Sequence, residues 1–167
     1  VGQMPKEAFD SLNVPYIEKV GVIREAITES EALNNLYQLT ENSGFELPNR
    51  LQNAFHTSLK TSDISCLTVM AGVSGTGKSA YPKLYAQSMG LHFLPLAVEP
   101  RWDSPQDLFG FLNYMENRFE ATTLGRAFVQ FNNSPHCSEY ANLNNQILLV
   151  LLDEMNLARI EYYFSEF

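Results

Sequence analysis

The sequence has little cysteine and little charge of either sign. Of its 167 residues only two are cysteines, and charged residues make up 18%. Cys66 opens an apolar run, which predicts a small buried side chain, whereas Cys137 lies in a polar stretch. A structural zinc site needs four ligands at short paired spacings, and these two residues do not complete one. The cysteine content therefore favours free thiols in a reducing compartment.

Runs of basic residues and long apolar stretches are also missing. The formal net charge is -8 and the sequence pI is about 4.8, which excludes a protein that coats nucleic acid along its phosphate backbone. No apolar stretch approaches the roughly 20 residues of a membrane span, and no signal peptide opens the chain. We therefore expect a cytoplasmic protein without a membrane partner. Because the chain starts at Val1 and stops within a helical pattern at Phe167, we expect it to be C-terminally incomplete.

Hydrophobic residues, at 45%, are sufficient for a folded core, and their spacing predicts helices in the first third of the chain. One helix is expected to begin near Ser30, a partial N-cap, and to end at 42–44. A second is expected from Pro48 to Lys60. The predicted inward positions are Leu33, Leu36, Tyr37 and Leu39 in the first helix, and Leu51, Ala54, Phe55 and Leu59 in the second. Residues 20–23 fit a short strand or a helix start equally well.

From residue 61 the pattern changes to apolar runs that alternate with helical segments. Buried strands are predicted at 66–71, 93–98 and 147–152, because short continuous apolar runs suit strands covered on both faces. The segments between them predict a helix to about Met89, a helical turn at 105–109, a hairpin or loop at 111–121, a helix at 122–131 and a loop at 132–146. This order predicts an α/β fold with a parallel sheet flanked by helices. Residues 1–60 then form a mostly helical N-terminal extension and 61–167 a partial P-loop core.

The eight residues from 72 to 79 match the phosphate-binding pattern G-x-x-x-x-G-K-[ST] without a departure: Gly72, Val73, Ser74, Gly75, Thr76, Gly77, Lys78 and Ser79. Glycines let the backbone wrap closely, so that consecutive N–H groups point at phosphate oxygens near the positive end of the next helix. Lys78 is expected to bridge the β- and γ-phosphates, and the Ser79 hydroxyl to bind Mg²⁺. Pro82 lies one turn into that helix, where its missing N–H is tolerable.

A second candidate element is the apolar run at 147–152, which ends in two carboxylates, Asp153 and Glu154. The end of a parallel strand lies at the carboxyl edge of the sheet, where ligands of α/β proteins bind. Asp153 is expected to hold Mg²⁺ through water, and Glu154 to orient or deprotonate the attacking water. An aspartate followed by a glutamate favours hydrolysis over kinase chemistry. Arg159 fits either a contact to a neighbouring subunit's nucleotide or a solvated helix face.

Three segments together resemble the AAA+ module of McrB-type proteins, in the dynein-related branch of AAA+ proteins. They are the phosphate loop 72–79, the segment Pro100–Gly110 with its Asp-Leu-x-Gly element, and the run Leu152–Arg159. The resemblance covers roughly residues 45–167. It implies a P-loop NTPase that hydrolyses ATP or GTP with Mg²⁺ between the subunits of a ring, usually a hexamer. It also implies a nuclease partner in a DNA restriction system, with DNA bound only indirectly or through other domains.

The resemblance transfers to four positions: Lys78, Ser79, Asp153 and Glu154. The family's sensor asparagine, arginine finger and helical lid would lie beyond Phe167, so we expect the chain alone to bind nucleotide and to turn over slowly. An alternative is a regulatory or assembly module in which occupancy rather than hydrolysis is the signal. A weaker alternative is a kinase, but the Asn-rich stretch 132–146 offers no basic lid.

Several aromatic and histidine side chains have no role in these motifs. Core packing is the favoured interpretation for all of them, although the first four also fit a ring pore or a base-binding surface. They are Trp102, Phe111, Tyr114 and Phe119, with His56 and His92 on apolar elements.

Overall fold

The computed structural model of the chain describes residues 6–17, 27–45, 47–133, 143 and 146–165. The chain divides into two compact units, and each is described here by itself. The first unit combines residues 1–24 with 94–167, and the second unit spans 25–93. The predicted boundary near residue 60 stays a prediction. The expected element at 20–23, Cys137 and most of the predicted loop 132–146 lie outside the described residues.

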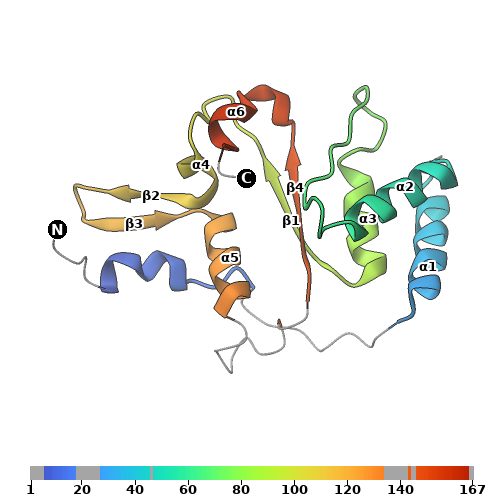
Figure 1. Cartoon of the computed structure of the whole chain (residues 1–167), viewed down its shortest axis with the longest axis horizontal. Coiled ribbons are helices and arrows are strands. Elements are labelled where there is room, and N and C mark those ends of the chain that lie inside the picture. Colours follow the sequence, from blue (N-terminus) through green and yellow to red (C-terminus); the bar gives the residue numbers. More distant parts are fainter. Residues whose placement is uncertain (1–5, 18–26, 46, 134–142, 144–145, 166–167) are drawn as a thin grey trace. The chain divides into compact units, whose positions relative to one another are not determined.

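Three helices form the second unit: α1 (Glu29–Asn42), α2 (Asn49–Lys60) and α3 (Ala80–Met89) (Figure 1). α2 and α3 agree with the sequence prediction to within about a residue, and α1 ends where it was expected. α1 begins at a capping box made by Thr28 and Glu31, two residues before the predicted start, because this pair satisfies both free N–H groups reciprocally. α1 packs along α3, and the Ser88 hydroxyl of α3 donates to the Ala32 carbonyl of α1 at 3.2 Å.

The buried face of α2 differs from the predicted one. Leu51 is 53% exposed and Ala54 is exposed, whereas Gln52 is buried beside Phe55. Gln52 reaches this position because its side-chain amide donates to the Leu47 carbonyl at 3.0 Å, which satisfies a backbone group just before the helix begins. The predicted inward residues Phe55 and Leu59 do lie on the covered side.

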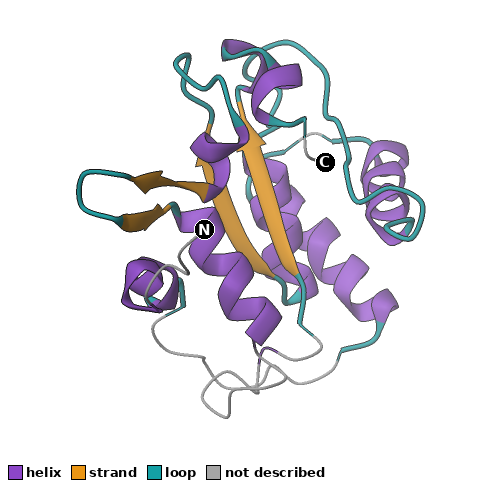
Figure 2. Cartoon of the chain, turned by 60° about the vertical axis from the view of Figure 1, so that its left-hand side comes forward, coloured by secondary structure: helices purple, strands orange, loops and turns teal. Residues whose placement is uncertain are grey.

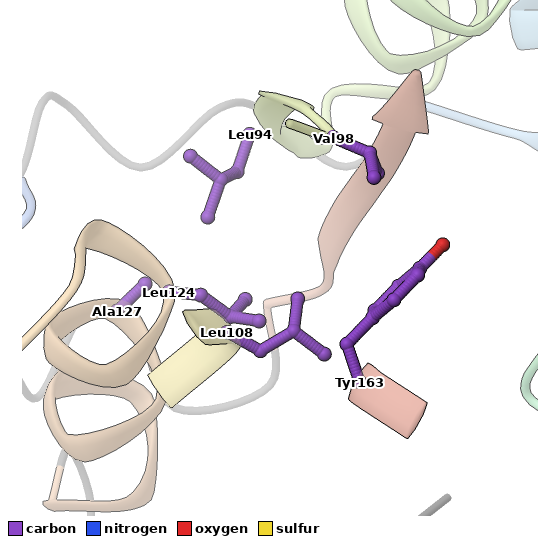
Figure 3. Packing of buried hydrophobic residues seen from close by; sticks show 6 residues of the cluster. All are labelled: Leu94, Val98, Leu108, Leu124, Ala127 and Tyr163. Atoms are coloured by element: carbon purple, nitrogen blue, oxygen red, sulfur yellow. The ribbon is translucent and has the colours of Figure 1, made fainter. Parts of the chain in front are cut away.

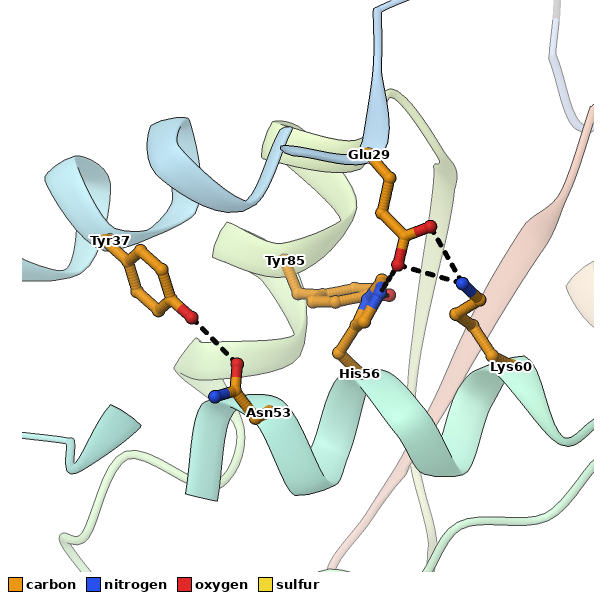
Figure 4. Close-up of polar contacts among 6 residues, drawn as sticks. All are labelled: Glu29, Tyr37, Asn53, His56, Lys60 and Tyr85. Carbon is orange, nitrogen blue, oxygen red and sulfur yellow. Dashed lines mark hydrogen bonds and ion pairs between the residues drawn. The ribbon is translucent and has the colours of Figure 1, made fainter. Parts of the chain in front are cut away.

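A polar network joins the three helices, and it corrects the expectation that His56 is a packing residue (Figure 4). His56 lies between the Tyr85 hydroxyl, at 2.8 Å, and the Glu29 carboxylate, at 2.9 Å. Lys60 donates to both oxygens of Glu29 at 2.8 Å. Since an ionised carboxylate only accepts hydrogen bonds, the Nε2 atom of His56 carries a proton. The network therefore links the start of α1 to α2 and α3.

This network predicts a loss of stability in acid. Hydrogen bonds from Lys60 and then from His56 lower the pKa of Glu29 from 4.5 to about 2. A lowered carboxylate pKa contributes stability that is complete above pH 4.5 and is lost as the pH falls to about 2. Thermal unfolding at a series of pH values should show a wild-type advantage over Glu29→Gln that shrinks across this window. Glu41→Gln, on the exposed side of the same helix, is the control; an advantage independent of pH would contradict the prediction.

The first unit contains two small sheets. β1 (His92–Ala97) pairs with β4 (Leu148–Asp153), and both strands run in the same direction (Figure 2). These strands confirm two of the three predicted, each shifted by about one residue. β2 (Gly110–Asn113) and β3 (Arg118–Ala121) form an antiparallel hairpin. Of the two alternatives predicted for 111–121, a hairpin or a loop, the hairpin is confirmed. A mixed α/β fold with a small parallel sheet is thus present.

Helices of the first unit surround these strands. They are the 3-10 helix η1 (Lys6–Asn13), α4 (Pro105–Phe109), α5 (Thr123–Asn133), the 3-10 turn η3 (Met155–Leu157) and α6 (Ile160–Tyr163). α4 and α5 agree with the predicted helical segments. α4 begins at a capping box of Ser104 and Asp107 with Pro105 in the first turn, and it ends after five residues at Gly110, whose φ angle is 126°. η1 packs on β3, where the Ser11 hydroxyl accepts from the Ala121 N–H at 3.1 Å.

The hydrophobic core of the first unit lies where β1, α4, α5 and α6 meet. Figure 3 shows its six fully buried members: Leu94, Val98, Leu108, Leu124, Ala127 and Tyr163. Strands β1 and β4 are only partly covered, since the side chains of β4 are all half-buried. The core therefore holds the carboxyl ends of β1 and β4 next to α4 and α6.

The predicted buried strand at 66–71 is wrong. The segment has no strand conformation, Cys66 is exposed and Val69 is 71% exposed. A strand needs a neighbouring strand for its N–H and C=O groups, and the regular elements in the described part of the second unit are three helices and the first residues of β1. An apolar run by itself does not supply such a neighbour.

The aromatic side chains are divided between core and surface. Trp102 is partly buried against the core, and its ring meets Tyr163 edge-on at 5.5 Å. Phe119 is also half-buried, whereas Phe111 is half-exposed and Tyr114 is 84% exposed at the hairpin tip. Core packing is therefore wrong for Phe111 and Tyr114, because a two-stranded hairpin covers only one of its faces.

Candidate phosphate-binding site

The phosphate-loop sequence folds as a turn that leads directly into α3. Gly75 and Gly77 have φ angles of 82° and 83°, in the left-handed region that glycine adopts at no steric cost. The Gly77 carbonyl accepts hydrogen bonds from the N–H groups of Ala80, at 3.1 Å, and Tyr81, at 2.9 Å. The glycines of the motif therefore allow the backbone to bend at this point, and the loop ends at the N-terminus of α3.

Side chains of the loop fold back onto its own backbone. The Lys78 ammonium donates to the Val73 carbonyl at 2.6 Å, and the Thr76 hydroxyl donates to the same carbonyl at 2.9 Å. Both bonds reach the second residue of the loop, one from its middle and one from near its end. The lysine is only partly buried, so its charge stays within reach of an anion that approaches the loop.

Phe45 contacts the loop from outside the motif. This residue follows α1, and its N–H donates to the Thr40 carbonyl at 3.0 Å. A methyl group at Gly77 would lie 2.1 Å from the Phe45 Cε1 atom, well inside van der Waals contact. Sequence analysis missed this residue, because nothing in the linear pattern connects an aromatic residue between two helices to a loop thirty residues later. Phe45 therefore enters the candidate site from the structure alone.

The helix after the loop is anchored by an aromatic cluster. Phe55 of α2 meets Tyr81 and Tyr85 of α3 edge-on, with ring centroids 5.2 and 5.1 Å apart. Burial raises the pKa of Tyr85 to about 12 and also raises that of Tyr81. Pro82 is buried in the first turn of α3, a position at which its missing N–H is tolerable. Because Tyr81 follows Ser79 by two residues, this cluster holds the helix end that carries the loop.

The two candidate carboxylates lie at the end of β4. The Asp153 carbonyl accepts from the Val98 N–H at 3.0 Å, and its side chain accepts from the Glu154 N–H at 3.1 Å. Glu154 has a φ angle of 56°, a left-handed conformation that costs a non-glycine residue free energy. Its side chain is exposed, and its carbonyl accepts from the Leu157 N–H at 2.9 Å. The chain therefore turns sharply just after Asp153 and presents Glu154 to solvent.

The two halves of the candidate site belong to different units. The phosphate loop with Lys78 and Ser79 lies in the second unit, and Asp153 with Glu154 lies in the first. The expectation that Ser79 and Asp153 share one Mg²⁺ ion thus stays a prediction. Asn156 lies in η3 and Arg159 immediately before α6, rather than on one helix.

The chain matches no protein-family model, no curated protein and no solved structure. Within the described residues, no three His, Cys, Asp or Glu side chains are grouped closely enough to hold a metal ion. None of the helices in the described ranges is both long and apolar enough to cross a membrane.

Proposed function

We propose that the chain binds a nucleoside triphosphate, ATP or GTP, with Mg²⁺ and is the nucleotide-hydrolysing module of an AAA+ motor of the McrB type. The observation that carries the proposal is the complete G-x-x-x-x-G-K-S sequence in a glycine-turned loop at the start of α3. The strained Glu154 directly after a parallel strand supports it, since strained backbone is concentrated at functional sites.

Each residue has a defined task in this proposal. Backbone N–H groups of the loop and the N-terminus of α3 receive the phosphates. Lys78 exchanges its bond to the Val73 carbonyl for the β- and γ-phosphate oxygens. Glu154 orients the water that attacks the γ-phosphate, and its exposure leaves room for that water.

The donor chemistry suits magnesium. Mg²⁺ takes oxygen ligands and is usually held by one or two carboxylates, phosphates and water rather than by a cage of protein groups. The Ser79 hydroxyl and the Asp153 carboxylate are such ligands. When bound, the ion neutralises charge on the β- and γ-phosphates. By resemblance we further propose assembly into a ring, in a restriction complex with a nuclease subunit.

The test is calorimetric titration of ATP and of GTP, each with Mg²⁺, into the chain. We expect one nucleotide to bind, and Lys78→Ala to weaken it by roughly 10- to 100-fold, as expected for the loss of charge-assisted hydrogen bonds. Lys83→Ala is the matched control, because Lys83 is an exposed lysine on α3, the helix that follows the loop. Equal affinities in all three proteins, or no binding at all, would contradict nucleotide binding at this loop.

A further inference from the structure

A pocket of about 480 Å³ lies in the first unit, between the loop after β1 and the turn after β4. Its volume is in the range of small-molecule sites. It lies at the carboxyl end of two neighbouring parallel strands, the position at which open α/β sheets bind ligands. Its lining includes Arg101, Trp102, Asp103, Asn156, Arg159 and Tyr162. The lining does not include the proposed Mg²⁺ ligand Asp153.

Both walls of the pocket are held by backbone and capping hydrogen bonds. On the β1 side, the Trp102 N–H donates to the Glu99 carbonyl at 3.0 Å, and the Asp103 N–H donates to the Asp107 carboxylate at 2.9 Å. On the β4 side, the Tyr163 hydroxyl donates to the Met155 carbonyl at 3.2 Å. These bonds fix the backbone of both walls, so a ligand does not have to order the main chain of the pocket when it binds.

The two arginines are oriented before any ligand arrives. The Arg159 guanidinium donates to the Tyr162 hydroxyl at 3.2 Å and lies 5.6 Å from the centre of that ring. The Arg101 Nε atom donates to the Glu99 carboxylate at 2.6 Å, so its two terminal amino groups can donate to other acceptors. Guanidinium groups fixed in this way suit planar or tetrahedral oxyanions, to which they donate in pairs.

We propose that this pocket is a second ligand site, which binds the oxyanion of a small molecule with a planar body. Arg159 and Arg101 receive the phosphate or carboxylate group, and the rings of Trp102 and Tyr162 border the body of the ligand. Glu99 offsets part of the Arg101 charge, so Arg159 contributes more to binding. None of the residues that line this pocket belongs to the phosphate loop, and the proposed binding does not depend on nucleotide hydrolysis.

Trp102 is the only tryptophan of the chain, so its fluorescence reports on this pocket. The probes are phenyl phosphate and benzoate, which separate a phosphate ligand from a carboxylate ligand. We expect a saturable fluorescence change with one of them, confirmed by calorimetric titration of the same probe into the wild-type chain. Arg159→Gln should weaken binding by roughly 10-fold or more, as expected for a charge-assisted bond. Arg118→Gln, which removes an exposed arginine of the hairpin, should leave the affinity unchanged.

Circular dichroism of each variant confirms that it is folded before its affinity is compared. Probe binding that persists in Lys78→Ala supports a ligand site at the pocket. Probe binding that disappears in Lys78→Ala assigns the anion to the phosphate loop. That result overturns the inference and leaves the proposed nucleotide site intact. No saturable signal with either probe overturns the inference, as does equal affinity in wild type and Arg159→Gln.

Discussion

Replacing Glu154 by Gln is expected to lower nucleotide hydrolysis by roughly 10²- to 10⁴-fold and to leave nucleotide affinity nearly unchanged, which is the usual effect of losing a general base. The amide keeps the size of the side chain and the left-handed backbone, so the turn after β4 should persist. What the variant loses is the negative charge that orients and deprotonates water. Rate and affinity should therefore separate.

The measurement is phosphate release by the chain at saturating nucleotide, beside a calorimetric titration of the same samples. Glu161→Gln is the matched control, because Glu161 is an exposed glutamate on α6 only seven residues further along the chain. Hydrolysis unaffected by Glu154→Gln would contradict the assigned role. Nucleotide binding and residual phosphate release that are both the same in the wild type and in Glu154→Gln would favour the alternative function, a regulatory module that responds to occupancy.

Gly77→Ala is expected to distort the phosphate loop and abolish nucleotide binding. Two costs add at this position. A residue with a β-carbon in the left-handed region loses about 1–2 kcal/mol, and the φ angle of Gly77 is 83°. The new methyl group would also approach the Phe45 ring to 2.1 Å, so the ring must move; overpacking of this kind costs about 1–3 kcal/mol.

Gly75→Ala separates these two costs. Gly75 has nearly the same φ angle, 82°, but a methyl group there meets nothing within 4 Å. In denaturant unfolding, Gly77→Ala should therefore be less stable than Gly75→Ala. When Phe45→Ala has already removed the ring, adding Gly77→Ala should cost no more stability than Gly75→Ala costs in the wild type. Equal destabilisation by the two alanine variants would show that Phe45 does not constrain the loop.

The elements that follow from local sequence were predicted well. α2 and α3 appear within about a residue of their expected bounds, and α4 appears at its predicted residues. Helices and caps depend on hydrogen bonds between residues three or four positions apart, so a short stretch of sequence specifies them. The same holds for the bend at Gly75 and Gly77, because the motif itself supplies the glycines that its backbone needs.

Strands and contacts across the chain were predicted less well, for a physical reason. Both 66–71 and 147–152 are short apolar runs, yet only the second forms a strand that pairs with another strand. Pairing depends on a distant segment, and apolar composition does not encode which segment that is. The rotation of α2, with Gln52 inward and Leu51 outward, likewise follows from a backbone carbonyl outside the helix.

The sequence by itself determined the glycine bend of the loop 72–79, the helices α2, α3 and α4 and the carboxylates at the end of β4, because each is specified within a few consecutive residues. The tertiary structure alone decided that Phe45 lies against Gly77 and that Arg101 and Arg159 line one pocket. These pairs lie more than thirty residues apart in the chain. Only folding brings them together, since the free energy of such contacts comes from packing between elements rather than from local backbone preference.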